Sequence, residues 1–252
     1  MLLALLSDLH ANIRALDACL ADARSRGAQR FAFLGDLVGY GAEPAAVLDR
    51  VMALHEAGAL VLQGNHDALA CSPVDAVQAR TLGEGSAAWA HSQLGAAHTE
   101  FLAQLPLTLQ TDDCLLVHAS ADAPSQWRYV EDARGAGVSL AAALEMPGVR
   151  NVFGGHVHHQ TLYYGGAGRS LMKFSPTAGV AVPMPRHRQW IATVGSVGQP
   201  RDGDTRAMSA VFDPAGPAIT FYRVAYDHLA AAAAIRRSGQ PEFFAQRLED
   251  GH

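Results

Sequence analysis

The stretch L-L-A-L-L-S-D-L-H at residues 2–10 determines how the rest of the chain is interpreted. Residues 2–7 form an apolar run, which is typical of a β-strand that is buried on both faces. Asp8 and His10 come at the end of this run, so we expect both side chains at the carboxyl end of the strand. In α/β sheets, ligands and catalytic groups gather at that edge.

Four further clusters of metal-binding side chains follow apolar runs in the same manner. They are G-D (Gly35, Asp36), G-N-H-D (Asn65, His66, Asp67), L-V-H-A (His118) and G-G-H-V-H (His156, His158). With the first cluster they supply seven candidate ligands, enough for two divalent cations. His66 is not among these ligands and is a candidate for proton transfer. Carboxylate, imidazole and amide ligands without a thiolate suit Mn²⁺, Fe or Zn²⁺ in a site with roughly five or six ligands.

The spacing within two of these clusters predicts how an ion could be held. Asp8 and His10 stand two residues apart, as do His156 and His158. On an extended backbone, residues i and i+2 point to the same side, so either pair could bind one ion. A carboxylate shared by two ions would hold them about 3.5–4 Å apart, the spacing used for in-line phosphoryl chemistry. Two such ions can convert a bridging water to hydroxide at neutral pH.

The order of apolar and helical segments predicts an α/β fold. In the first part of the chain, strand-like runs alternate with helical patterns, which implies parallel strands joined by right-handed crossovers. The predicted strands are 2–7, 30–34 and 59–63, and the predicted helices are 13–26 and 43–57.

The second part of the chain is richer in strands. Residues 72–105 are mostly helical in composition, with interruptions expected at 83–85 and near Gly95. The elements predicted after them are a strand at 113–118, a helix at 138–145, strands at 150–154, 162–164, 171–174, 189–194, 207–213 and 218–225, and helices at 229–237 and 242–248. Two packed sheets with helices on their outer faces would bury the apolar residues of the helix-rich first part and of the strand-rich second part. Because no linker separates them, we predict one domain over residues 1–252, on which the C-terminal helices (about 229–250) pack.

Charge and cysteine content exclude several classes of protein. The net charge is −5 and no block of Lys or Arg occurs, so the footprint of a general nucleic-acid binder is missing. The three cysteines form no C-x-x-C pair, which fits a reducing cytosol. The opening apolar run is too short for a signal peptide, and no apolar stretch has the length of a membrane span. We expect a cytoplasmic protein without a membrane partner, and a homo-oligomer is left open.

The five clusters resemble the pattern of the calcineurin-like metallophosphoesterase superfamily, which is D-x-H, G-D, G-N-H-[DE], H and G-H-x-H. The resemblance spans residues 8–158 and the order matches throughout. It implies a four-layer α-β-β-α sandwich of two mixed sheets flanked by helices, with a two-metal site at one edge. It also implies these roles: Asp8, His10 and His158 hold the first metal, Asp36 bridges, Asn65, His118 and His156 hold the second, His66 is the leaving-group acid, and Asp67 is the nearest candidate to orient it.

One departure from the pattern bears on the type of substrate. The protein Ser/Thr phosphatase branch carries G-D-x-V-D-R-G, whereas this chain reads G-D-L-V-G-Y-G. Gly39 and Tyr40 therefore replace an Asp that would steady the histidine and an Arg that would bind phosphate. The chain is more similar to the small bacterial phosphodiesterase-like members, and we expect diesters to be turned over at least as well as monoesters.

Two further segments are candidates for contact with the substrate. Residues 193–204 resemble the P-G-S-x-[GS]-x-P-R loop of those bacterial members, so Ser196, Gln199 and Arg201 are expected to line the substrate cleft. A plain Gly/Pro turn between strands is the alternative. Residues 127–129 (Trp-Arg-Tyr) could form a base-stacking or phosphate-binding rim, or could pack against their own loop.

Two functions of different classes fit the sequence. The first is a dinuclear metal-dependent phosphoesterase, which hydrolyses phosphodiester or phosphomonoester bonds of a small molecule or nucleotide by metal-activated hydroxide, with His66 as the acid. The alternative is a non-catalytic scaffold of the same fold that binds partner proteins. Scaffolds of this kind typically lack the acid histidine or a ligand. Because all of these residues are present here, the sequence favours the enzyme, with two ions of which manganese is the first choice.

Overall fold

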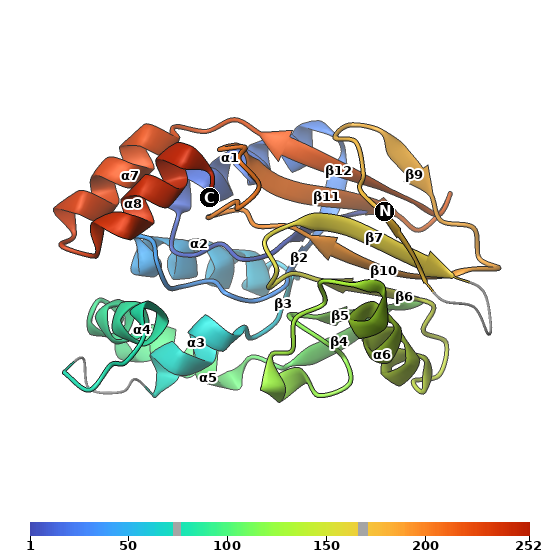
Figure 1. The fold of residues 1–252 in the computed structure, drawn as a ribbon, viewed down its shortest axis with the longest axis horizontal. Helices are drawn as coiled ribbons and strands as arrows, with labels where there is room; N and C mark the ends of the chain where they lie inside the picture. Colours follow the sequence, from blue (N-terminus) through green and yellow to red (C-terminus); the bar gives the residue numbers. More distant parts are fainter. Residues whose placement is uncertain (73–76, 166–170) are drawn as a thin grey trace.

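Two mixed β-sheets packed face to face form the centre of the molecule (Figure 1), in a computed structural model that describes residues 1–72, 77–165 and 171–252. In these residues the first sheet has the order β3 (Leu60–Val61), β2 (Ala28–Phe33), β1 (Leu2–Leu6), β11 (Ala207–Asp213), β12 (Ala218–Val224) and β9 (Ala181–Pro183). The second has the order β4 (Thr108–Thr111), β5 (Cys114–Val117), β6 (Asn151–Gly154), β10 (Gln189–Val194), β7 (Gln160–Gly165) and β8 (Met172–Phe174).

Each sheet contains a run of parallel strands, and these runs position the site. In the first sheet, β2 is parallel to both β1 and β3, and in the second, β6 is parallel to both β5 and β10. Antiparallel strands complete the first sheet beyond β1 and the second sheet on both sides of its parallel run. Parallel strands point their carboxyl ends to one edge. The segments that carry the polar clusters follow β1, β2, β3, β5 and β6, so they all leave the sheets there.

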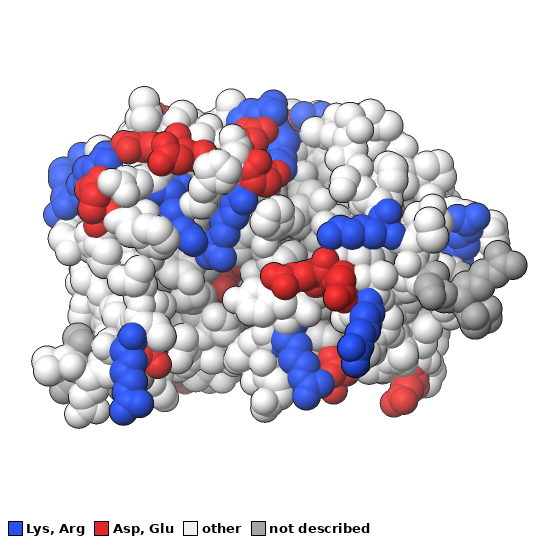
Figure 2. Space-filling view, in the orientation of Figure 1, with Lys and Arg blue, Asp and Glu red and all other residues white. Residues whose placement is uncertain are grey.

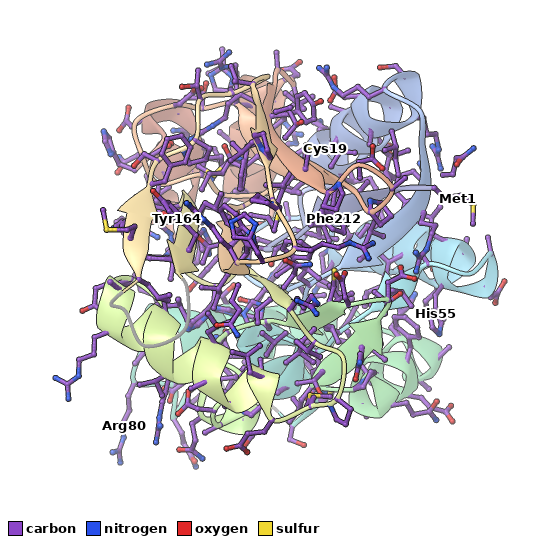
Figure 3. The ribbon with its side chains drawn as sticks, turned by 90° about the vertical axis from the view of Figure 1, so that its right-hand side faces the viewer. Met1, Cys19, His55, Arg80, Tyr164 and Phe212 are labelled. Atoms are coloured by element: carbon purple, nitrogen blue, oxygen red, sulfur yellow. The ribbon has the colours of Figure 1, made fainter. Side chains whose placement is uncertain are left out.

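Strand β1 shows how the apolar sequence is divided between the layers. Leu3 and Leu5 belong to the core between the two sheets, whereas Ala4 and Leu6 belong to the core under the helices. This alternation follows from the period of two in an extended chain. Between the sheets, the rings of Phe153 on β6 and Phe212 on β11 lie 5.0 Å apart, and Figure 3 shows Phe212 in the interior.

Helices form the two outer layers. Helices α1 (Ile13–Ser25) and α2 (Pro44–Glu56) pack on the first sheet, and α6 (Ala133–Leu144) packs on the second. The remaining helices are α3 (Asn65–Cys71), α4 (Leu82–Ser92), α5 (Ala96–Gln104), α7 (His228–Arg237), α8 (Glu242–Asp250) and a 3-10 turn, η1 (Pro124–Gln126). The predicted α/β fold, a four-layer α-β-β-α sandwich of two mixed sheets, is confirmed.

The C-terminal helices pack together as a pair. Ile235 of α7 and Phe244 of α8 share an apolar cluster, and Tyr40 from the segment after β2 packs against it. The rings of Tyr40 and Phe244 lie 5.0 Å apart. This contact brings the C-terminal helices beside a segment that carries one of the polar clusters, as the neighbouring positions of α2, α7 and α8 in Figure 1 show.

The structure corrects several predicted boundaries. Strands β4 and β9 were not predicted, because both are short and lie at or near a sheet edge, where few apolar residues are needed. The interruption predicted at 83–85 is wrong, because these residues begin α4. Thr81 and Glu84 form a capping box there, with Thr81 Oγ1 accepting from the Glu84 N–H at 3.1 Å. The break near Gly95 is confirmed, whereas residues 73–76 of that segment lie outside the described residues.

In the part of the chain that the structure describes, none of the helices combines the length and apolar character that crossing a membrane requires.

Candidate metal centre

Three of the polar clusters, those that contain Asp8, Asp36 and His156, lie on tight turns directly after strands. The backbone is left-handed at these positions, with φ of 54° at Asp8, 44° at His10, 54° at Asp36, 68° at His156 and 57° at His158. The extended backbone assumed from the two-residue spacing is therefore wrong. His156 and His158 belong to different groups of candidate ligands, as the resemblance implied: the first joins Asp36 and the second joins Asp8.

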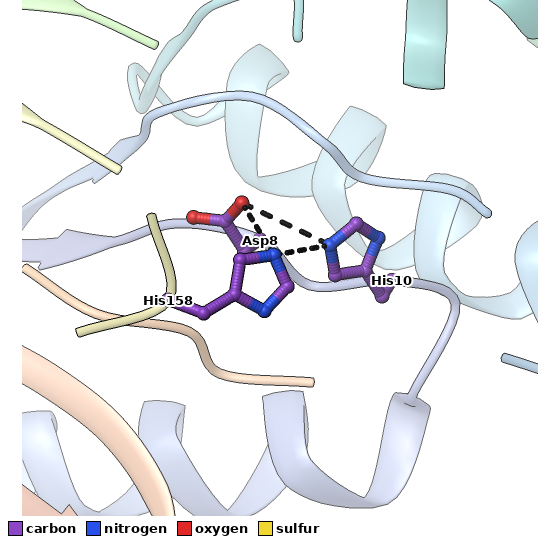
Figure 4. A group of neighbouring side chains, drawn as sticks. All are labelled: Asp8, His10 and His158. Atoms are coloured by element: carbon purple, nitrogen blue, oxygen red, sulfur yellow. Dashed lines mark hydrogen bonds and ion pairs between the residues drawn. The ribbon is translucent and has the colours of Figure 1, made fainter. Parts of the chain in front are cut away.

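Asp8, His10 and His158 form the first group of candidate ligands (Figure 4). The two Nε2 atoms of His10 and His158 are 3.1 Å apart. The Oδ1 atom of Asp8 lies 3.3 Å from His158 Nε2 and 3.8 Å from His10 Nε2. All three side chains are almost completely buried. Three electron-rich atoms thus meet at one point that water does not reach.

Hydrogen bonds on the far side of each imidazole decide where the ring protons lie. His10 Nδ1 is 3.2 Å from the carbonyl oxygen of Val38, and His158 Nδ1 is 2.6 Å from that of Gln199. A carbonyl oxygen can only accept, so both Nδ1 atoms carry hydrogen. In a neutral ring the Nε2 atom then carries a lone pair. Both lone pairs and a carboxylate oxygen therefore point at one another, an arrangement that a cation would stabilise.

The second group consists of Asp36, His118 and His156. His118 Nδ1 donates to the carbonyl oxygen of Leu34 at 2.7 Å, so its Nε2 faces inward. That Nε2 lies 3.4 Å from Asp36 Oδ2 and 3.2 Å from Asn65 Oδ1. The Nε2 atom of His156 is buried and has no hydrogen-bond partner.

Asp36 lies between the two groups. Its Oδ2 atom is 3.4 Å from His118 Nε2 and 3.8 Å from His10 Nε2, so one oxygen faces a histidine of each group. Its Oδ1 atom accepts from the backbone N–H of His66 at 2.8 Å. The backbone contact fixes the carboxylate, which leaves the other oxygen directed at both groups.

Burial and charge set the protonation of this cluster. Burial raises the pKa of the Asp8 and Asp36 carboxyls, but His158 beside Asp8 and His118 beside Asp36 outweigh it and hold both well below the ordinary value. Burial lowers the pKa of His156 to about 4, and His118 adds to this effect. Burial also lowers the pKa of His118, but Asp36 reverses that effect and raises it to about 9.

The donor set fits divalent metal ions. Buried carboxylates normally need a counter-charge, and buried polar atoms normally have a partner. Here Asp8 Oδ1 and His156 Nε2 are buried without a hydrogen bond. Oxygen and imidazole donors with carbonyl-bonded Nδ1 atoms are the combination in which histidines bind metals. The seven candidate ligands predicted from the sequence are Asp8, His10, Asp36, Asn65, His118, His156 and His158, and the structure brings them together.

His66 lies beside these groups, at the start of α3. Its ring is 5.2 Å from that of His10 and 4.3 Å from that of Tyr40. Its Nδ1 atom is buried without a partner, and burial lowers the pKa of the ring. Gly39 closes over this nitrogen: a Cβ at residue 39 would lie 2.7 Å from it, and the φ of 90° also requires glycine.

Asp67 does not orient the His66 ring, which differs from the prediction. Its Oδ1 accepts from the N–H groups of Leu37 and Val38 at 2.8 and 3.2 Å, and its Oδ2 accepts from that of Gly64 at 2.8 Å. Successive side chains on a helix point about 100° apart, so Asp67 and His66 leave α3 in different directions. Burial, together with Asp36, raises the pKa of Asp67 to about 7. Asp67 thus ties the segment after β2 to the one after β3.

The loop after β10 holds the three residues expected to line a substrate cleft. Ser196 is fully buried; its hydroxyl donates to the carbonyl oxygen of Asp8 and accepts from the N–H of Gln199, so it supports the first group of ligands instead. Gln199 is also buried, and its carbonyl oxygen holds His158. Its side-chain oxygen accepts hydrogen bonds from Arg201 and from Arg247 of α8.

Arg247 was not identified from the sequence. It lies in a short amphipathic helix near the C-terminus, and no motif distinguishes it from a solvated arginine. On the opposite side of the site, Tyr129 stacks on His156 with 4.1 Å between ring centres, and the ring of Trp127 is 5.9 Å from that of His118. The segment 127–129 therefore borders the second group, next to a cavity of about 420 Å³.

Comparison with known proteins places this site in a family. Residues 1–215 match the calcineurin-like phosphoesterase superfamily domain. The chain belongs to this superfamily. A crystal structure of a metallophosphoesterase from Sphaerobacter thermophilus is 32% identical, with a TM-score of 0.87 over 100% of this chain and 99% of that one.

Two archaeal proteins are similar along the whole chain. The uncharacterized protein MJ0912 of Methanocaldococcus jannaschii is 27% identical over 98% of this chain and 97% of its own length. The crystal structure of hypothetical protein PH1004 from Pyrococcus horikoshii OT3 has a TM-score of 0.77 at 17% identity, covering 100% of this chain and 98% of that one. Both similarities extend across the C-terminal helices, beyond the matched superfamily domain.

Replacing a candidate ligand should weaken metal binding, whereas replacing its exposed neighbour should not. We expect His158→Ala to weaken Mn²⁺ binding by about tenfold or more, because a nitrogen of the first group is lost. His159 is exposed, and its Nδ1 contacts the carbonyl oxygen of Val157, so His159→Ala is the matched control. Calorimetric titration of chelator-treated protein measures both. Equal affinities for the two variants would contradict the assignment.

A methyl group at residue 39 should displace His66 without removing a ligand. We expect Gly39→Ala to keep the metal content of the wild type and to lower phosphoester hydrolysis on the order of 10²-fold, the effect of misplacing a reacting group by about 1 Å. Gly58→Ala is the control, because residue 58 also has a positive φ (99°) but nothing within 4 Å of the new methyl group. The idea fails if both variants lose the same activity.

Proposed function

We propose that this protein is a dinuclear metal-dependent phosphoesterase that hydrolyses phosphodiester or phosphomonoester bonds. The observation that carries the proposal is the position of Asp36, whose Oδ2 atom faces a histidine of each ligand group at 3.4 and 3.8 Å. A carboxylate in this place can be shared by two ions. Membership of the calcineurin-like phosphoesterase superfamily supports the same reading.

The seven candidate ligands are assigned to two ions. Asp8, His10 and His158 would hold the first, Asn65, His118 and His156 the second, and Asp36 both. When bound, two divalent cations lower the pKa of a water molecule and neutralise charge on phosphoryl oxygens. We propose manganese, while the donor set also suits iron or zinc. Because the Nδ1 atoms of His10, His118 and His158 are fixed by carbonyl groups, the rings need little reorganisation.

His66 is proposed to give a proton to the leaving oxygen. Its backbone N–H donates to Asp36, so the His66 side chain leaves the backbone directly beside the carboxylate that both ions would share. Gly39 and the ring of Tyr40 limit its movement on two sides. A positioned acid of this kind contributes roughly 10²–10⁴-fold to a rate. No carboxylate is needed to hold the ring, because packing does so.

The remaining parts of the proposal concern the substrate and its setting. The proposed substrate is a small-molecule phosphoester or nucleotide, and the cavity beside Trp127 and Tyr129, whose rings offer stacking surfaces, is its proposed binding place. Diesters are proposed to be turned over at least as well as monoesters, because Tyr40 occupies the arginine position of the protein phosphatases.

We propose a cytoplasmic setting, which fits the free thiols of the three cysteines. A homo-oligomer stays open.

The function is tested by metal-dependent hydrolysis. Chelator-treated protein is reloaded with Mn²⁺ and assayed with bis(p-nitrophenyl) phosphate and with p-nitrophenyl phosphate. We expect no activity before reloading, and activity that rises until two ions are bound per chain. Asp36→Asn should lose most of it together with metal. A protein that binds two ions but hydrolyses neither substrate would instead support the scaffold alternative.

Removing His66 should affect leaving groups unequally. We expect His66→Ala to keep both metals and to slow a diester with an alkoxide leaving group by roughly 10²–10⁴-fold, but to slow one with a p-nitrophenolate leaving group far less, because the latter needs no proton. His187 is an exposed histidine two residues before β10, so His187→Ala is the control variant. Equal slowing for both leaving groups would rule out the role of proton donor.

A further inference from the structure

Two arginines from distant parts of the chain meet at one buried glutamine. Arg201 donates from Nε and from an Nη atom to Gln199 Oε1, at 3.3 and 3.0 Å. Arg247, on α8, donates from Nη1 to the same oxygen at 3.1 Å. A neutral amide oxygen cannot compensate two positive charges, so the pair keeps most of its capacity to bind an anion.

Neither arginine has an acidic partner among the described residues. Neighbouring arginines do: Arg206 pairs with Asp204, Arg223 with Asp202, and Arg236 with two glutamates. The Nε atom of Arg247 is buried and makes no hydrogen bond. Burial and the nearby Arg201 lower the pKa of Arg247, as expected of two like charges held together. Figure 2 shows basic side chains reaching from the C-terminal helices toward the middle of this face.

The arginine pair is linked to the metal centre by short contacts. The guanidinium of Arg201 lies 5.8 Å from the ring centre of Tyr40. That ring lies 4.6 Å from His10 and 4.3 Å from His66. Gln199, which holds the arginines by its side chain, also holds the candidate ligand His158 by its carbonyl oxygen at 2.6 Å. One aromatic ring therefore separates the pair from the residues that would act on the phosphoryl group.

Helix α8 is fixed firmly enough for Arg247 to recognise a ligand. Gln240, just before α8, donates to the carbonyl oxygen of Gly41 at 2.8 Å. The N–H of Gly203 donates to the carbonyl oxygen of Gly251, also at 2.8 Å, which ties the end of α8 to the loop of Arg201. The two guanidinium groups are thus held at a set separation. Residue 247 lies outside the matched superfamily domain, which ends at 215.

We propose that Arg201 and Arg247 bind a second phosphoryl group of the substrate, next to the one that is cleaved. The inference rests on the proposed phosphoesterase function and narrows its substrates to phosphoesters that carry at least two phosphoryl groups. Guanidinium groups match phosphate oxygens with paired N–H donors, and a phosphate dianion balances two of them. The reacting group would lie at the ions held by the seven candidate ligands, and the two arginines would bind its neighbour.

Binding to the metal-free protein tests the anion site without catalysis. Inorganic pyrophosphate is titrated calorimetrically into chelator-treated wild type, Arg247→Gln, Arg247→Lys and Arg237→Gln. Arg237 is an exposed arginine of α7, so Arg237→Gln is the matched control. We expect saturable binding that Arg247→Gln weakens about tenfold or more, as for loss of a charge-assisted hydrogen bond, while the control matches the wild type. No saturable binding, or equal affinities for all four, would overturn the proposal.

Kinetics with a matched pair of substrates test whether the site serves a second phosphate. Thymidine 5′-(p-nitrophenyl phosphate) is compared with the same ester carrying a 3′-phosphate. We expect Arg247→Gln to lower kcat/KM about tenfold more for the second ester than for the first, and Arg247→Lys to fall between. Equal factors for the two esters would mean that the arginines act on the reacting group and would overturn the proposal.

The two experiments separate this proposal from the function on which it rests. If the Mn²⁺-loaded wild type hydrolyses neither ester, the proposed function fails, while the pyrophosphate titration still decides whether the arginines bind a phosphate. If the wild type hydrolyses both esters but Arg247→Gln leaves their ratio unchanged, the phosphoesterase function stands and the second subsite is rejected. Thermal unfolding of Arg247→Gln and Arg247→Lys checks that both variants are folded.

Discussion

The structure depends on one constraint: lone pairs and carboxylate oxygens of buried side chains converge on one small region. His10 and His158 each donate Nδ1–H to a carbonyl group, so their Nε2 lone pairs face each other at 3.1 Å beside the Asp8 carboxylate. Without a cation, such a cluster is costly to bury. The rest of the fold has to hold it together against that cost, which explains why so many backbone contacts surround it.

Those contacts are backbone hydrogen bonds between the segments that follow neighbouring strands. The N–H groups of Asp8 and His10 donate to the carbonyl oxygens of Gly35 and Asp36, both at 3.0 Å, so the segments after β1 and β2 remain side by side. Left-handed turns then aim the side chains at one point. Gly64 allows a close approach of the two segments, because a Cβ there would lie 2.2 Å from Asp36 Oδ1. Positions in the cluster are therefore set by backbone geometry before any ion binds.

Strands and polar clusters could be predicted from the sequence, because they follow from the order of apolar and polar residues. Side-chain directions could not, because they depend on backbone angles. Strand β1 was evident because its residues are apolar on both faces, and the clusters were found because each follows such a run. The spacing alone allowed His156 and His158 to bind one ion, but it assumed an extended chain, whereas the two residues belong to different ligand groups, as the resemblance to the family implied. Asp67 was misassigned because the start of α3 at Asn65 turns it away from His66. Arg247 carried no local signal, because its partner Gln199 is distant in the chain.

The candidate metal centre and the arginine pair are built by different parts of the chain. The ligand groups are built by segments that the sheets fix, and all of them lie within the matched superfamily domain. The arginine of α8 reaches the site from outside that domain, through a packing contact between Tyr40 and Phe244. Tyr40 stands where the protein phosphatases carry an arginine. In the proposed subsite, Arg247 supplies a positive charge from the C-terminal helix, one aromatic ring away from the candidate ligand His10, where it would meet a neighbouring group of the substrate instead of the reacting one.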